Sequence, residues 1–400
     1  MSKKRRILYF FLVGIFLFCG FFLPNNVVYA DSSTEDTITD LTNLINEQLE
    51  NLDLSNFEEL LNNLSEEQKQ IFGSSDFFSK LKSLLSGEQQ LDFAGILSCI
   101  FSLISGNILN VIPVLSLICA VAILSGLLSQ IRPKAMNKSL GDIIHFVCFG
   151  FVVLIIFGSV GQLVLITKNT LVGLQTQMEI GFPILLTLMT AIGATVSVGI
   201  YQPAVAVLSG VMLTFCVDIL MPIFVFSIIF NVAGNISNNV KLTKFSTFFS
   251  NTFKWIIGLV FTVFSAFLTV QGISAGSYDG ISIRATKYAI KSYVPILGSY
   301  LADGFSLILS SSILIKNGIG VSGLILLFAT IIGPLLKIVI FQLGLNLVSA
   351  ILEPISDNRT NGFLSGIAKS LNMLIAIILA FSFAYFIMIS LIMCTSNAMV

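Results

Sequence analysis

Three charged residues lie inside long apolar runs of this sequence, where an ionised side chain is costly. They are Asp218, Asp303 and Lys337, within predicted membrane spans at 204–230, 294–315 and 321–350. Charges in such positions mark ion or solute pathways in some membrane proteins, and in others they pair to hold helices together. The sequence therefore indicates either a polar pathway or an Asp–Lys pairing that fixes helix packing.

Motifs for catalysis are missing. His145 is the only histidine and lies at one end of a predicted span, where a packed or interfacial imidazole is more common than a catalytic base. No HExxH, GxSxG or phosphate-binding loop is present. The surroundings of Asp279 and Asp303 resemble those in intramembrane aspartyl proteases, but the GxGD pattern is absent and Asp279 is expected in a loop. We therefore expect that the protein has no catalytic residues and is not an enzyme.

Cysteine and glycine positions indicate helix packing rather than a metal site. Cys19 lies in the N-terminal apolar run, and the other cysteines all lie in later apolar runs: Cys99, Cys119, Cys148, Cys216 and Cys394. None has the spacing or the exported position of a metal site or disulfide framework. Gly272 and Gly276 have GxxxG spacing, which allows close approach of two helices. We expect no metal, no cofactor and no nucleic-acid partner.

The composition places most of the chain in a membrane. Of 400 residues, 55% are hydrophobic and 10% are charged, and the mean hydropathy is +0.95. Soluble domains are about 45–50% apolar and about 25% charged. The formal net charge is zero, but residues 31–92 hold 14 acidic and 3 basic side chains. The sequence predicts an all-α fold with an acidic soluble part and a membrane part flanked by basic residues.

The N-terminus has the three-part layout of a secretory signal. Basic residues at 3–6 precede an apolar run at 7–23, and Val28 and Ala30 stand at the third and first positions before a cut ahead of Asp31. An uncleaved first span is the alternative, because the run is just long enough to cross a bilayer. We predict three parts: a signal peptide at 1–30, an exported acidic helical segment at 31–92 and a multispanning membrane domain at 93–400.

Short amphipathic helices are expected in the exported segment. Ser55 with Glu58, and Ser65 with Gln68, fit the capping box that begins a helix. A segment of 62 residues has a marginal hydrophobic core of its own. Its apolar faces are therefore expected to dock on the membrane part or on a partner.

Eight membrane crossings are predicted after the signal, from apolar runs of about 20 residues or more. Residues 93–130 carry no charge, and we divide them near Gly106 into an interfacial helix and one crossing, with two crossings as the open alternative. A tight turn is expected at Tyr201, Gln202 and Pro203. The predicted crossings lie at about 108–130, 143–166, 182–200, 204–230, 255–275, 294–315, 321–350 and 371–394.

The distribution of cations favours a topology in which residues 31–92 are exported. Eight cations then lie in predicted inside loops and five, including Lys168 and Lys316, in outside loops, in agreement with the positive-inside rule. One inside group, Arg284, Lys287 and Lys291, falls within about 60° on a helical wheel. This group predicts either a basic amphipathic helix that lies on anionic lipid headgroups, here called the elbow, or a basic loop without helical structure.

Several sequence blocks resemble the stage III sporulation protein AE family of endospore-forming bacteria. The similarity also covers the order of signal, exported segment and multispanning region, and it is strongest from about 230 to 356. These motifs are specific for the family but bring no catalytic residue with them. The blocks are KLTKF at 241–245, VQGIS at 270–274, DGISIR at 279–284, Lys287, PI at 295–296, LIKNG at 314–318 and LEPI at 352–355.

The resemblance implies a membrane component of the channel-like complex that joins mother cell and forespore after engulfment and supports late forespore gene expression. The protein would lie in the mother-cell membrane around the forespore, in contact with membrane lipid and with other stage III membrane proteins. Residues 31–92 would then occupy the intermembrane space and face a forespore membrane protein.

Two hypotheses about function follow from the sequence. The first is a non-enzymatic membrane subunit of that complex. The second is a secondary transporter or permease, free-standing or within the complex, in which Asp218, Asp303 and Lys337 bind an ion or small solute. Spans broken by Gly and Pro suit both, since each needs some backbone exposed to a cavity.

The predicted topology can be tested by labelling a cysteine at Lys287. In a chain whose own cysteines are replaced, we expect Lys287→Cys to react with a membrane-impermeant maleimide only from the cytoplasmic side. A cysteine placed in residues 31–92 is the control and should react only from the other side. Labelling of the Lys287 position from outside alone would invert the topology.

Overall fold

The computed structural model describes residues 43–45, 47–49, 55–62, 66, 68–69, 81, 93–135, 138–236, 242–293, 297–354 and 358–397. The chain divides into two compact units, Met1–Glu47 and Gln48–Val400, and all the contacts described below lie within the second. The predicted signal peptide and the cut between Ala30 and Asp31 lie outside the described residues. Both stay predictions.

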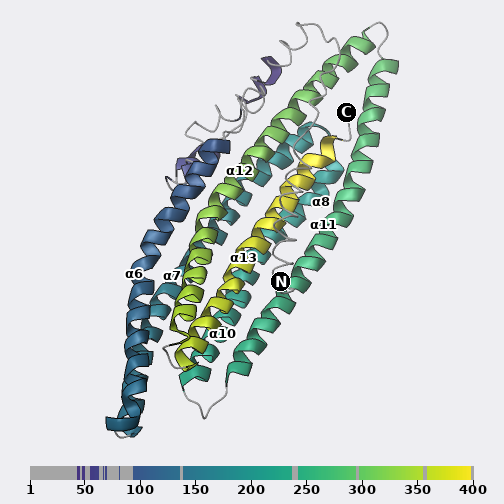
Figure 1. Ribbon diagram of the computed structural model, residues 1–400. Coiled ribbons are helices and arrows are strands. Elements are labelled where there is room, and N and C mark those ends of the chain that lie inside the picture. Colours follow the sequence, from purple (N-terminus) through teal and green to yellow (C-terminus); the bar gives the residue numbers. More distant parts are fainter. Residues whose placement is uncertain are drawn as a thin grey trace. The chain divides into compact units, whose positions relative to one another are not determined.

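Long helices make up the second unit (Figure 1), and all its described secondary structure is helical. A short helix, α3 (Ser55–Asn62), precedes them. The long helices are α6 (Phe93–Ala135), α7 (Lys138–Ala191), α11 (Thr243–Tyr293), α12 (Gly298–Leu352) and α13 (Asn358–Asn397). Between α7 and α11 run the consecutive segments α8 (Thr195–Ala206), η1 (Val207–Val211), α9 (Met212–Thr214), η2 (Phe215–Leu220) and α10 (Met221–Ile236), of which η1 and η2 are π-helical.

Six candidate spans in the described part of the chain are long and apolar enough to cross a membrane. The all-α prediction is confirmed, but the count of eight is not. The single helix α12 takes in residues 298–315 of the predicted span at 294–315 and all of the span at 321–350, and α7 likewise takes in the span at 143–166 and the first half of the one at 182–200. The 55 residues of α12 extend about 80 Å, against a hydrocarbon core of about 30 Å. Polar residues between apolar runs continue these helices instead of ending them.

The central helix of this unit is α13, which contacts α7, α10, α11 and α12. Of its most apolar stretch 56% is buried, against 22% for α6 and 17% for α11. Phe363, Ile377 and Phe381 of α13 are fully buried, whereas Phe101 of α6 and Trp255 of α11 are each 72% exposed. The outer helices thus present apolar faces suited to lipid around an apolar core.

A close contact joins α10 to α13. Asn231 of α10 donates its Nδ2–H to the carbonyl oxygen of Phe363 at 3.1 Å. A Cβ atom on Gly366 would collide with the side-chain amide of Asn231, so a larger residue here would displace this amide. The close packing predicted at Gly272 and Gly276 falls where the structure describes only the helical backbone of α11, and it stays a prediction.

A tight turn around Gly193 ends α7. Gly193 has φ 88°, a left-handed conformation that glycine adopts without steric cost. Its N–H donates to the Thr190 carbonyl at 2.9 Å, and the Ala194 N–H donates to the Met189 carbonyl at 2.9 Å, which together form a Schellman motif. The turn expected at Tyr201 is wrong, because residues 201–203 lie inside α8. Pro203 predicted a turn, but the chain reverses at Gly193, where the backbone adopts a left-handed conformation.

The N-terminus of α8 is capped by Asp279, which lies far away in the sequence on α11. The Val196 and Ser197 N–H groups donate to its two carboxylate oxygens at 3.1 and 2.9 Å. Ala194, at the N-cap position, offers no side-chain hydrogen bond. A carboxylate here satisfies two unpaired N–H groups and complements the helix dipole. Asp279 is 1% exposed and helical, so the loop predicted there is wrong.

Replacing this cap should destabilise the protein. We expect Asp279→Ala to lower the free energy of unfolding by about 1–2 kcal/mol, the usual cost of removing a helix N-cap. Titrated SDS unfolding in mixed micelles measures the change, and Asp303→Ala, at an exposed aspartate, is the control. Equal stability of the two variants would contradict the capping role.

Candidate functional site

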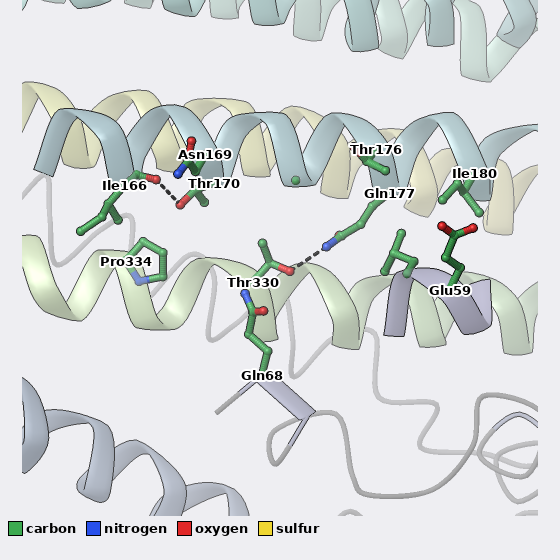
Figure 2. A pocket seen from close by; sticks show the side chains of 12 residues that line it. Glu59, Gln68, Ile166, Asn169, Thr170, Thr176, Gln177, Ile180, Thr330 and Pro334 are labelled. Carbon is green, nitrogen blue, oxygen red and sulfur yellow. Dashed lines mark hydrogen bonds between the residues drawn. The ribbon is translucent and has the colours of Figure 1, made fainter. Parts of the chain in front are cut away.

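A cavity of about 640 Å³ lies between α7 and α12 (Figure 2). Glu59 and Leu60 of α3 and Gln68, which follows α3, contribute to its wall. Figure 2 shows Gln68 pointing toward Thr330 of α12 from the side opposite to Gln177 of α7. Most of the remaining polar lining comes from Asn169, Thr170 and Thr176 of α7. The cavity thus brings a group of polar side chains together between helices that are otherwise apolar.

The best-defined contact in the cavity wall joins α7 to α12. Gln177 donates its Nε2–H to the Thr330 hydroxyl oxygen at 2.6 Å. Gln177 is 3% exposed and Thr330 is 5% exposed. The second polar atom of the amide, Gln177 Oε1, has no hydrogen-bond partner among the residues that the structure describes. Because an unpaired buried acceptor costs about 1–3 kcal/mol, this oxygen is a candidate ligand-binding atom.

Two local features of the sequence shape the cavity. Residues 167–179 of α7 are rich in Thr, Asn and Gln, and they separate the two apolar runs of that helix; sequence reasoning placed them in an outside loop. Pro334 lies inside α12 and has no N–H, so the Thr330 carbonyl lacks the donor that normally reaches it from four residues further on. Gly173 adds no side chain, which leaves the space open.

A second polar cluster lies where α12 and α8 meet the C-terminal end of α13. Lys316 of α12 is 0% exposed, and its Nζ donates to the Ile392 and Met393 carbonyl oxygens at 2.9 and 3.0 Å. Tyr201 of α8 shares a 2.7 Å hydrogen bond with the Thr395 hydroxyl. A cation among the last carbonyls of a helix complements its dipole. The loop position predicted for Lys316 is therefore wrong, because the residue is helical and buried.

The three charged candidates from the sequence do not meet in one site. Asp303 and Lys337 are 34 positions apart on the same helix, or about 50 Å. Asp218 lies in the π-helical segment η2. Asp218 and Asp303 are exposed, and Lys337 is partly exposed. The helix-locking pair is not seen for Asp303 and Lys337, and a role of these residues in ion or solute movement stays a prediction.

The three basic residues of the predicted elbow lie in the last part of α11. Arg284 and Lys291 are exposed and Lys287 is partly exposed, while Ile283, one turn before Lys287, is 4% exposed. The segment is therefore helical. Its binding to anionic headgroups stays a prediction.

The described residues of these clusters contact one another through hydrogen bonds. Within the described ranges, no group of three or more His, Cys, Asp or Glu side chains could hold a metal ion. Their cysteines are free thiols. Sequence reasoning missed the cavity because, apart from Glu59, its residues are uncharged; the signal that could have revealed it was the run of Thr, Asn and Gln inside an apolar region.

These features define a class, an all-helical protein whose described part holds six spans apolar enough for a membrane. A family model described as Stage III sporulation protein AE matches residues 75–396, so the chain belongs to that family. The protein of that name from Bacillus subtilis (strain 168) is 26% identical over 215 residues, which are 54% of each chain. The aligned region thus spans about half of that relative's length. No solved structure matches the chain.

The buried Lys316 contact can be tested by local hydrogen exchange. We expect Lys316→Met to release the last turn of α13, since about 1.5 kcal/mol of charge-assisted hydrogen bonding is lost, and amides near Ile392 should exchange roughly tenfold faster. Mass spectrometry of the corresponding peptide measures this, with Lys337→Met on the same helix as the control. Unchanged exchange at that turn would show that Lys316 does not hold it.

Proposed function

We propose that the protein is a non-enzymatic multi-pass membrane subunit of the sporulation complex that links mother cell and forespore, needed for late forespore development. The observation that carries this proposal is the family match over residues 75–396, a range that takes in all six candidate spans. The protein would occupy the mother-cell membrane around the forespore. Its partners there are membrane lipid and the other membrane proteins of stage III.

The acidic N-terminal segment supplies the contact with a forespore membrane protein in this proposal. Part of it already packs on the helices: Leu49, Leu60 and Leu81 are 1%, 8% and 0% exposed. Gln48 accepts hydrogen bonds from the Ser311 and Ser312 hydroxyls of α12, each at 3.2 Å. The part of the segment from Gln48 onward is thus anchored on the membrane part, and exposed carboxylates such as Glu58 remain on its surface.

The exposed position of Asp218 also supports a subunit role. It lies near the middle of the candidate span Thr195–Ile236, next to Ile219, which is 47% exposed. A carboxylate facing lipid at that depth costs about 2.5–3.5 kcal/mol. Contact with a neighbouring protein or with enclosed water removes this cost.

A permease, alone or within the complex, is the second candidate. The polar cavity between α7 and α12 favours it, because transport needs a polar site among apolar helices. In this function Asp218, Asp303 and Lys337 would bind an ion or small solute on its path.

Purification from sporulating cells distinguishes the two functions. We expect the tagged protein, taken after engulfment, to bring the other stage III membrane proteins with it. Asp218→Asn should reduce this recovery severalfold if Asp218 faces a partner. If the carboxylate instead serves transport, the complex should assemble normally while spore formation fails. Asp303→Asn is the matched variant at a second exposed carboxylate.

Replacing part of the acidic segment tests whether it binds the forespore partner. Residues 31–47 can be replaced by a Gly/Ser linker of equal length, which keeps the signal and leaves Gln48 and Leu49 in place. We expect membrane insertion to persist and capture of the forespore partner to be lost. Normal capture by this variant would exclude a docking role for residues 31–47, and recovery of the wild-type protein without any stage III partner would exclude the subunit function.

A further inference from the structure

The hydroxyl groups in the cavity between α7 and α12 present acceptors, not donors. Each threonine hydroxyl hydrogen is already used by a carbonyl oxygen of its own helix. What each hydroxyl offers to the cavity is therefore its oxygen lone pairs. The three bonds run from Thr170 to Ile166 at 2.8 Å, from Thr176 to Val172 at 3.1 Å and from Thr330 to Leu326 at 2.9 Å.

The orientation of the Gln177 amide is related to the direction in which the Thr330 hydroxyl donates. Thr330 donates its hydroxyl hydrogen to Leu326, so toward Gln177 it can only accept. The structure places the amide nitrogen toward Thr330, which leaves Oε1 without a partner among the described residues. Residue 334 is a proline without an N–H, so the carbonyl of Thr330, a residue that lines the cavity, can accept a further hydrogen bond.

The charged side chain in the cavity wall is negative, as the hydrogen-bond acceptors there would require for a cationic ligand. Glu59 of α3 brings a carboxylate to the wall, and no Lys or Arg side chain lines the cavity among the described residues. Gln68 and Asn169 carry amides, which can serve as donor or acceptor. A wall with several acceptors, one negative charge and one unpaired buried oxygen suits a positively charged ligand with several N–H donors.

We propose that this cavity binds a small primary amine in its ammonium form. A volume of about 640 Å³ accommodates an organic amine rather than only a bare ion. The ammonium donates to Gln177 Oε1 and the Thr330 carbonyl, and Glu59 balances its charge. This site is additional to the proposed subunit role and does not depend on it.

Calorimetry with putrescine tests the proposal on the full-length protein in phosphatidylcholine nanodiscs. We expect saturable binding of putrescine and none of its fully methylated analogue, 1,4-bis(trimethylammonio)butane, which has the same two positive charges but no N–H donor. Binding of both cations with equal affinity would overturn the proposal, because charge alone would then explain it. Absence of putrescine binding would overturn it as well.

Two variants assign the binding to the cavity. Nothing lies within 4 Å of a Cβ placed on Gly173, so Gly173→Leu should project its side chain into the cavity, one helical turn before Gln177, and we expect it to abolish binding. Gln177→Leu should weaken binding about tenfold through loss of one charge-assisted acceptor. Gln175→Leu, two positions away on α7 and outside the cavity wall, should leave the affinity unchanged.

Gly173→Leu keeps the test valid if Gln177→Leu fails to fold, since it removes no polar atom and replaces a poor helix former. Putrescine affinity unchanged in Gly173→Leu would overturn the proposal.

Nanodiscs with phosphatidylethanolamine distinguish the source of the amine. Competition by this lipid would support the ammonium site and assign it to a lipid headgroup, whereas unchanged affinity would support a free amine.

Discussion

Peptide groups in the hydrocarbon core of a membrane have no water to bind, so each N–H and C=O must find its partner within the protein. The second unit meets this requirement with uninterrupted helices: α7, α11 and α12 have 54, 51 and 55 residues. Where the chain does break, as between α7 and α8, other groups supply the missing bonds. The Schellman motif at Gly193 satisfies the carbonyls that end α7, and Asp279 satisfies N–H groups that begin α8.

The same requirement explains what sequence reasoning predicted of the fold and what it did not. Composition is a bulk property, so the all-helical membrane class could be predicted from it. The number of spans was derived from the thickness of one bilayer, and that measure cannot tell a loop from a polar stretch that stays helical. Lys316 is the clearest case: a lysine between two apolar runs predicts an outside loop, whereas the structure buries it against the end of α13.

Contacts over long sequence separations account for most of what was missed in the candidate site. The charges of Asp218, Asp303 and Lys337 stand out in a hydropathy pattern, yet the structure leaves them apart. The cavity between α7 and α12 depends on Gln177 and Thr330, which are 153 positions apart and uncharged. Asp279 was visible as a charge, but its cap on α8 depends on how two helices pack. Family membership, in contrast, could be recognised from short local blocks.

The cap on α8 also sets an order of events during synthesis. Asp279 follows Ser197 by 82 positions, so the N-terminus of α8 leaves the ribosome well before its cap does. At about 5–20 residues per second, the delay is roughly 4–16 s. During that time the Val196 and Ser197 N–H groups must be satisfied by water, by lipid headgroups or by the insertion machinery. The turn between α7 and α8 therefore reaches its final form only when α11 docks, which couples the insertion of these two distant parts of the chain.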